Sequence, residues 1–364
     1  MAAITSAIEA DYINLLHIEP PKSEGLPAPE VNNDGALKRQ RNYFTTRFGD
    51  GEGQAPVEPG RYFILGSLGC GWARREHIIL RLLGLSEAVP FYLLTGKDSD
   101  GWLIATGDND IRERFGYDHL NDFYRATDPN FPGRGTSPTV IDSHTGKVVS
   151  NDYHVLPHDW EVAWKAFHAP DAPDLYPEDL RIDIDLLNQQ LFDDVNNGTY
   201  KVIFAQSRRA AQAAFEVFYA RLGDYDFRLS TRRYLFGASL SDSDVRLFQT
   251  LSTFERFYRP ALAAVFGEEA TKPLPAFEHL WGYARDLFQQ GLASEKEQYF
   301  LGLLPGPSGN YLPNNGFTPK GYPLRPHAES LADWLAPHDR AALTGSSESS
   351  GPGGAGSREH WQYI

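Results

Sequence analysis

The chain contains a single cysteine, Cys70, at a position where a thiol can act as a nucleophile. It follows an apolar run, Tyr62 to Leu68, and precedes a segment, Trp72 to Leu85, in which apolar residues recur at helical spacing. We therefore expect a strand, a turn and a helix, with Cys70 at the helix N-terminus. Backbone N–H groups and the helix dipole stabilise a thiolate there, and Arg74 and Arg75 add positive charge nearby.

Other uses of this cysteine are less consistent with the sequence. A cysteine chosen at random is more often a small buried hydrophobe, but the turn between a strand and a helix favours reactivity. One cysteine cannot form an internal disulfide or a Cys-rich zinc site. Because His154, His158 and His168 are spaced irregularly for one helix face, we expect no metal.

Composition restricts the class of protein. The length of 364 residues, with 41% hydrophobic residues, suggests two domains. A formal charge of −14 disfavours binding to nucleic acid and to anionic membranes. No segment reaches the ~18–20 uncharged apolar residues of a membrane-spanning helix, and the N-terminus lacks a signal-peptide pattern. We therefore expect a cytoplasmic protein that binds no membrane.

Four regions follow from the pattern along the chain. Residues 1–60 are rich in Pro, Gly and Asn and predict an extended arm that wraps the core. Residues 61–168 predict a β-α-β unit followed by a β-β-α unit, with Gly101 and Trp102 in a loop after the second strand. Residues 169–325 predict an all-helical domain, and residues 326–364 a tail that is partly disordered.

Two shorter signals concern local structure. Pro138 stands between a Gly-rich loop and a strand, where a cis peptide bond can be fixed and can expose the backbone of Ser137 to a ligand. Ser241 and Asp244 predict the N-cap and capping box of a buried helix, which is a structural role.

At this point the sequence resembles the Xi-class glutathione transferases, also called glutathionyl-hydroquinone reductases. The resemblance covers roughly residues 34–290 and rests on the order of several short motifs. These are Asp34-Gly35, Glu58-Pro59-Gly60-Arg61-Tyr62, Cys70-Gly71-Trp72-Ala73, Gly101-Trp102, Gly133-Arg134, Ser137-Pro138, Asp174-Leu175-Tyr176-Pro177 and Val195-Asn196-Asn197-Gly198-Thr199-Tyr200-Lys201.

The resemblance implies a fold, a chemistry and partners. The fold would be an N-terminal thioredoxin-like α/β domain followed by an all-α glutathione-transferase domain, and the protein would be a homodimer. Cys70 would attack the sulfur of a glutathionylated quinol-like aromatic, release the quinol and hold glutathione as a mixed disulfide. Glutathione would thus be the co-substrate. Because lysine is scarce relative to arginine, which is typical of GC-rich coding, mycothiol is an alternative thiol if the source is an actinomycete.

The resemblance also implies roles for individual residues on both sides of the thiol. Trp72, Trp102, Arg134, Ser137, Pro138, Asp152 and Tyr153 would bind the thiol co-substrate. Arg134 would pair with a carboxylate, the Ser137 backbone would bond the cysteinyl amide, and Asp152 would stand where the family has a glutamate for the γ-glutamyl amine. Tyr200 would donate to a quinol oxygen in the acceptor pocket, with Leu303 and Tyr311 as further pocket residues.

Three departures from the family pattern keep other functions open. Gly71 replaces the proline after the cysteine, Tyr153 replaces a serine, and Leu303 lies where the family has a Tyr-rich segment. A specialised paralogue in natural-product biosynthesis, catalysing thiol addition, elimination or isomerisation, is one alternative. A non-catalytic binding protein on the same fold is another.

Overall fold

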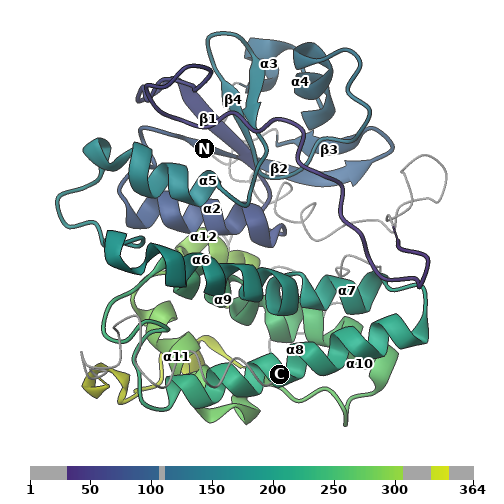
Figure 1. The fold of residues 1–364 in the computed structure, drawn as a ribbon, viewed down its shortest axis with the longest axis vertical. Coiled ribbons are helices and arrows are strands. Elements are labelled where there is room, and N and C mark those ends of the chain that lie inside the picture. The colour runs from purple at the N-terminus through teal and green to yellow at the C-terminus, as the bar shows by residue number, and fades with distance from the viewer. Residues whose placement is uncertain (1–30, 106–110, 306–328, 344–364) are drawn as a thin grey trace.

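The computed structural model describes residues 31–105, 111–305 and 329–343, which form two parts (Figure 1). The first is a sheet with helices on both faces, and the second is built from helices alone. This confirms the predicted fold class, a thioredoxin-like α/β domain followed by an all-helical domain.

One mixed sheet forms the core of the first part. Its strands are β1 (Tyr62–Gly66), β2 (Phe91–Asp98), β3 (Gly101–Ile104), β4 (Thr139–Asp142) and β5 (Lys147–Ser150). The order across the five-stranded sheet is β3-β2-β1-β4-β5. β1 and β2 are parallel, because helix α2 (Gly71–Leu82) makes the crossover between them, and the other neighbouring pairs are antiparallel.

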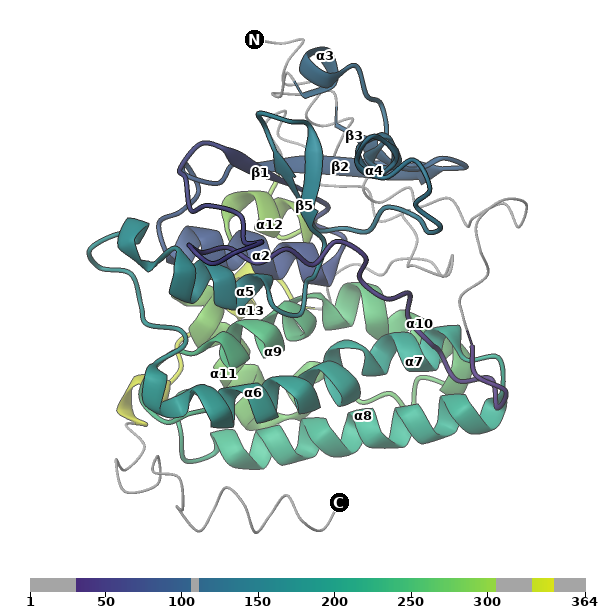
Figure 2. The same ribbon diagram turned by 45° about the horizontal axis from the view of Figure 1, so that its top comes forward.

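The alternation of side chains along β1 assigns each face of the sheet to different helices. Ile64 belongs to the larger core cluster, which includes Ile78 of α2. Leu65 belongs to a second cluster with Phe123 of helix α4 (Leu120–Thr127). Figure 2 shows α2 on one side of the sheet, with α4 and α3 (Ile111–Phe115) on the other. The face that carries α2 is therefore the face turned toward the helical part.

The loop predicted for Gly101 and Trp102 is wrong, because both residues lie in β3. The register pairs Trp102 with Lys97 of β2 across an irregularity between Thr95 and Lys97. The polar residues between the two strands suggest a long loop. In the structure, Asp98 Oδ1 accepts a hydrogen bond from the Asp100 N–H at 2.8 Å, and this bond closes a tight turn. The result is a hairpin that brings Lys97 over the ring of Trp102.

Helices make up the second part. They are α6 (Arg181–Gln190), α7 (Gly198–Phe204), α8 (Arg208–Leu229), α9 (Asp242–Thr253), α10 (Arg259–Phe266), α11 (Glu278–Gln289), α12 (Glu295–Phe300) and α13 (Leu331–Trp334). The short helix α5 (Leu156–His158) follows β5 and lies beside α2 in the first part. Every residue of α9 is buried, so α9 is the central helix of this part. Over the described ranges, no helix combines the length and apolar character needed to cross a bilayer.

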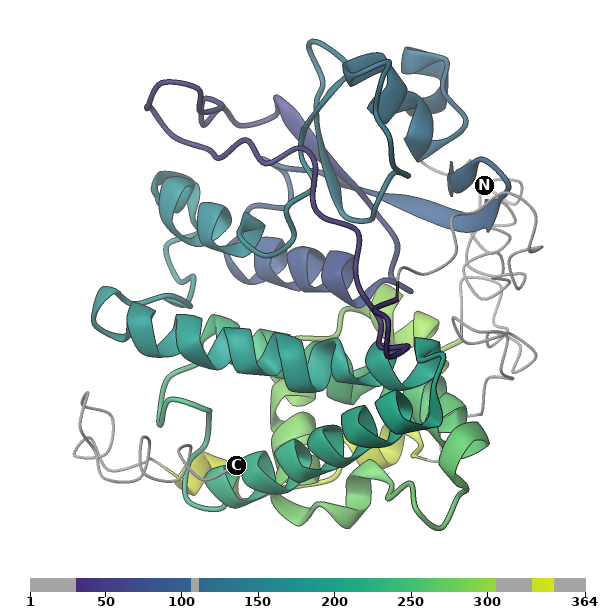
Figure 3. The ribbon, with the colours of Figure 1, turned by 45° about the vertical axis from the view of Figure 1, so that its right-hand side comes forward.

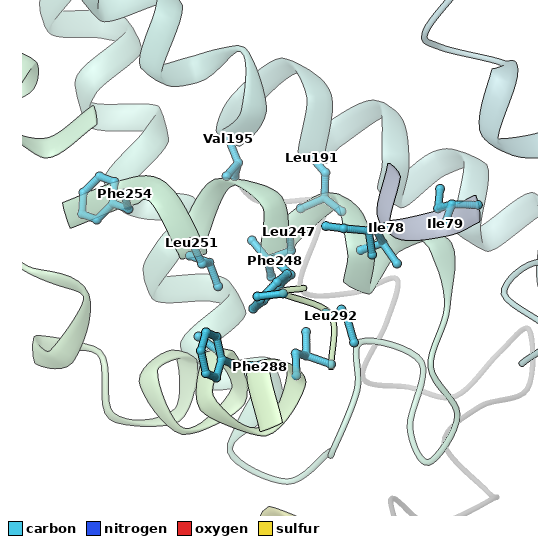
Figure 4. Close-up of a cluster of buried hydrophobic side chains, with 14 of the residues drawn as sticks. Ile78, Ile79, Leu191, Val195, Leu247, Phe248, Leu251, Phe254, Phe288 and Leu292 are labelled. Atoms are coloured by element: carbon cyan, nitrogen blue, oxygen red, sulfur yellow. The ribbon is translucent and has the colours of Figure 1, made fainter. Parts of the chain in front are cut away.

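Helix α9 also joins the two parts through a shared core. Figure 4 shows Ile78 of α2 directed toward Leu247 and Phe248 of α9, with Leu292 nearby and Ile79 next to Ile78 on the same helix. The exposed fraction of each of these five residues is 1% or less. The helix that begins at Cys70 is therefore held by apolar packing against the centre of the helical part.

The predicted capping box at the start of α9 is confirmed. Asp244 Oδ2 accepts from the backbone N–H of Ser241 at 2.8 Å and from its hydroxyl at 2.6 Å. Asp244 Oδ1 accepts from the Leu235 N–H and from the Tyr283 hydroxyl, both at 2.8 Å. Because Asp244 is fully buried, these four donors all depend on this one carboxylate.

Residues 31–61 cross from the helical part to the edge of the sheet, as the purple segment in Figure 3 shows. At one end the Gly35 carbonyl accepts from the Gln206 N–H at 2.9 Å. Gly35 has φ +83°, and a Cβ there would lie 2.9 Å from the Ser207 nitrogen, so only glycine fits. At the other end Asn42 Nδ2 donates to Asp152 Oδ1 at 2.7 Å. This segment, the arm, is thus held both by the helical part and by the residues that follow β5.

Candidate active site

Cys70 is the N-cap residue of α2, immediately after the turn that follows β1. Its thiol is half-buried and donates to the carbonyl oxygen of Ser137 at 3.2 Å. The Ser137–Pro138 bond is cis, and the Ser137 hydroxyl accepts from the Ser67 N–H at 3.1 Å. The predicted helix N-terminus and the predicted cis proline therefore meet at the thiol.

The two arginines downstream of Cys70 do not point to the thiol as expected. The guanidinium of Arg74 donates to the Gln249 carbonyl of α9, although its charge still acts on Cys70. Arg75 is held by Glu76 and by the Tyr153 carbonyl. Both side chains are buried, and Arg74 joins α2 to the helical part.

Two other cations lie near the thiol, Lys97 on β2 and Arg134 in the loop before Pro138. Burial, followed by the charge of Arg134, lowers the pKa of Lys97 to about 8. Burial, followed by the charge of Arg39, lowers the pKa of Arg134. The negative charge of a Cys70 thiolate would raise the pKa of both groups, because it attracts their positive charges. Within the described residues neither side chain has a carboxylate partner, so an anion bound here would meet uncompensated positive charge.

Near Cys70 the site also contains a cluster of aromatic rings. Trp72 stacks on Tyr153 with ring centroids 5.1 Å apart and on Tyr200 at 6.4 Å. The hydroxyl of Tyr200 lies 3.3 Å from that of Tyr258. Burial raises the pKa of both phenols, and the charge of Cys70 raises it further. Two neutral hydroxyl groups are therefore available beside the thiol.

Arg39 of the arm lies against this aromatic cluster. Its guanidinium carbon is 5.1 Å from the ring centroid of Trp72 and 4.7 Å from that of Tyr200. Its Nε donates to Asn197 Oδ1 at 2.5 Å. Its Nη2 is buried without an acceptor. The arm therefore contributes a side chain to the site in addition to wrapping the core.

The remaining residues proposed from the sequence occupy varied surroundings. Asp152 is half-buried and accepts from Asn42, and Trp102 is 7% exposed beneath Lys97. Leu303 is 5% exposed in the larger core cluster, so at most an edge of it can meet a ligand. Tyr311 lies outside the described residues.

Gly71, the departure after the cysteine, has a specific neighbour. A Cβ at this position would lie 2.3 Å from Oε1 of Gln249, which is buried on α9. Any side chain at residue 71, including proline, therefore requires the Gln249 side chain to move. The glycine accommodates close contact between the start of α2 and the helical part.

Two groups of acidic and imidazole side chains among the described residues have donor atoms within 4.8 Å of one another. In the first, His119 Nε2 pairs with Asp98 Oδ2 at 2.8 Å. In the second, Arg246 Nε donates to Asp242 Oδ2 at 2.6 Å. In each group a protein side chain thus already pairs with one of the carboxylates. We therefore assign a metal ion to neither group.

Arg39, Lys97 and Tyr258 are the site residues that sequence reasoning missed. Lys97 lies in a segment whose polar residues suggest a loop, and Tyr258 lies in a helical segment of mixed aromatic and charged residues. Arg39 follows Asp34-Gly35, which belongs to the family pattern, so that motif was the signal that could have drawn attention to it.

A cysteine at a helix N-terminus, opposite a cis proline in a thioredoxin-like domain that precedes an all-helical domain, defines a glutathione-transferase-like protein. Comparison with known proteins then gives the family. No protein-family model matches the chain. Glutathionyl-hydroquinone reductase YqjG of Escherichia coli is 32% identical over 246 residues, which are 66% of this chain and 72% of that protein. The chain belongs to the family of Xi-class glutathione transferases and glutathionyl-hydroquinone reductases.

Two further relatives agree with this assignment. Glutathionyl-hydroquinone reductase PcpF of Sphingobium chlorophenolicum is 31% identical over 203 residues, which are 55% of this chain and 64% of that protein, slightly less than two thirds of its length. The crystal structure of the glutathione S-transferase Xi from Phanerochaete chrysosporium superposes with a TM-score of 0.67. It is 28% identical, and the match covers 78% of this chain and 90% of that one.

Proposed function

We propose that the protein is a glutathione-dependent thiol transferase and reductase that removes glutathione from a glutathionylated quinol-like aromatic through a mixed disulfide on Cys70. The observation that carries this proposal is the position of the Cys70 thiol at the N-terminus of α2, 3.2 Å from the carbonyl oxygen before the cis Pro138. Lys97, Arg134 and the phenols of Tyr200 and Tyr258 are all within its electrostatic reach. The names of the reductase relatives give the same substrate class.

The proposed reaction has two steps. The Cys70 thiolate attacks the sulfur of the conjugate, forms an S–S bond to glutathione and breaks the bond between sulfur and the aromatic carbon. The electron pair of that bond stays on the aromatic carbon, which takes up a proton to give the free quinol. A second glutathione thiolate then attacks the mixed disulfide, releasing oxidised glutathione and the Cys70 thiolate.

The described residues fit these steps in two groups. Lys97 and Arg134 would hold carboxylates of glutathione, and the Ser137 backbone would bond its cysteinyl amide. Trp102, Pro138 and Asp152 would complete this side, whereas Trp72 and Tyr153 would lie between the thiol co-substrate and the aromatic one. Tyr200, paired with Tyr258, would donate to an oxygen of the leaving quinol.

Intact-mass spectrometry tests the proposal directly. We expect incubation with a glutathionyl-hydroquinone, without free glutathione, to release the quinol and to add one glutathionyl group to the protein, at Cys70. Adding glutathione should then remove the adduct. Parallel incubations with mycothiol conjugates determine which thiol is used. Quinol release without any adduct would contradict the mixed disulfide and favour thiol addition or elimination.

Binding of the thiol co-substrate should weaken in alkaline solution because of Lys97. Its pKa of about 8 means that the side chain is mostly charged at pH 7 and mostly neutral at pH 9, so attraction for a carboxylate falls as pH rises. We expect the Kd of S-methylglutathione, measured by calorimetry, to rise about five- to tenfold over this range beyond the effect of the ligand's own titration.

Two variants separate Lys97 from the titration of the ligand. Lys97→Met should bind weakly at pH 7 and should lose the additional pH dependence. Lys147→Met, at an exposed position on β5, should behave like the unmodified protein. An unchanged pH profile in Lys97→Met would remove Lys97 from the binding site. The homodimer remains a prediction from the family resemblance, and the cytoplasmic location remains a prediction from the sequence pattern.

A further inference from the structure

The position of Arg39 raises the question of what its guanidinium binds. The group lies against the rings of Trp72 and Tyr200, and its Nε is already used by Asn197. The two Nη atoms have no hydrogen-bond partner among the described residues, and Nη2 is buried. A buried donor without an acceptor is costly, so the arrangement favours a ligand that supplies one.

The charges around Arg39 make an anionic acceptor the favoured ligand. Burial is the largest cause of the raised pKa of Tyr153 and Tyr200 and of the lowered pKa of His154 and Arg134, and the charge of Arg39 also acts on each, so all four groups are within its electrostatic reach. Three of them are neutral at pH 7 and one is a cation. No ion pair between Arg39 and a carboxylate is found in the described part of the chain, so the positive charge is uncompensated.

A purely structural role accounts for only part of this geometry. The bond to Asn197 attaches the arm to the start of α7, and a neutral side chain could form the same bond. A guanidinium stacked on aromatic rings, with two free nitrogen atoms at its end, is suited to planar recognition of a carboxylate. The aromatic rings beside it would contact a flat ring that carries this carboxylate.

We propose that Arg39 binds a carboxylate carried by the aromatic acceptor, so that the substrates of this protein are glutathione conjugates of aromatic acids. The inference rests on the proposed function and specifies its substrate class. It also assigns different anions to the cations around Cys70, with Lys97 and Arg134 on the side of glutathione and Arg39 on the side of the acceptor.

The test compares two conjugates that differ only in the carboxylate, glutathionyl-hydroquinone and glutathionyl-2,5-dihydroxybenzoate. For the unmodified protein we expect kcat/KM to be about 10- to 100-fold higher for the carboxylated conjugate. Arg39→Gln should remove most of this preference, because KM for the carboxylated conjugate should rise much more than KM for the neutral one. Arg39→Lys should restore part of the preference. Arg41→Gln, at an exposed position of the same arm, should retain it.

Several results would overturn the inference. Equal turnover of both conjugates by the unmodified protein would do so without any variant, and the proposed function would stand. An equal loss of kcat/KM for both conjugates in Arg39→Gln would mean that Arg39 only holds the arm in place. A raised KM for glutathione would mean that Arg39 binds glutathione and not the acceptor. If the unmodified protein turned over neither conjugate and formed no Cys70 adduct, the proposed function would fail together with the inference.

Discussion

Cys70→Ala is expected to lower kcat/KM for release of a quinol from its glutathione conjugate by about 10⁴-fold or more. The proposed reaction needs a sulfur nucleophile, and among the described residues only Cys70 supplies one, within 3.2 Å of the Ser137 carbonyl. The loss should appear in kcat and kcat/KM alike, because the substitution leaves in place the substrate contacts proposed for Lys97, Arg134 and the aromatic rings. Quinol release followed by chromatography measures both parameters.

Cys70→Ser provides the matched control for this prediction. Its hydroxyl can keep the bond to the Ser137 carbonyl and cap α2, so folding should be preserved, but it cannot form a disulfide with glutathione. We expect it to be as inactive as Cys70→Ala. If Cys70→Ser retained a tenth of the activity or more, the mixed disulfide would be excluded, and Cys70 would instead position a bound thiol for addition or elimination.

Asp244→Ala is expected to lower the free energy of unfolding by about 3–5 kcal/mol, a large part of the stability of an ordinary domain. The substitution leaves the N–H groups of Leu235 and Ser241 and the hydroxyls of Ser241 and Tyr283 without their acceptor, in a fully buried place. Urea denaturation followed by circular dichroism gives the change. Because α9 packs on α2, we expect the loss of stability to extend to both parts of the molecule.

A second capping box in the same chain shows how much burial matters. At the start of α13 the side chain of Asp333 accepts from the Ser330 N–H at 2.7 Å, but this box is exposed. Water can replace the lost acceptor there, so Asp333→Ala should cost far less than Asp244→Ala. Equal losses from both variants would mean that local capping, and not the buried network, determines the contribution of Asp244.

The features predicted correctly from sequence depend on residues close together in the chain. The strand, turn and helix around Cys70, the cis bond at Pro138 and the capping box at Ser241 are each defined by one continuous stretch of the chain. The hairpin of β2 and β3 is equally local, but its turn is hidden by polar residues that also suit a loop.

The features that escaped prediction depend on distant contacts. Arg39 is positioned by Asn197, 158 residues further along the chain, and Tyr258 by Tyr200, 58 residues before it. Arg74 and Arg75 follow Cys70 directly, yet the direction of each side chain is set by the packing of α2 on α9. Spacing in a sequence cannot specify such contacts, because they arise only when the two parts of the molecule pack together.

The arm is a short connection that is held at both ends. Six residues lie between its contact at Gly35 and its contact at Asn42, so an extended chain can span at most about 25 Å between them. Arg39 lies within this stretch, outside any helix or strand, and its side chain is held by Asn197. A change in the length of the arm would therefore move Arg39 relative to the aromatic rings, while the helix that carries Cys70 stays as it is.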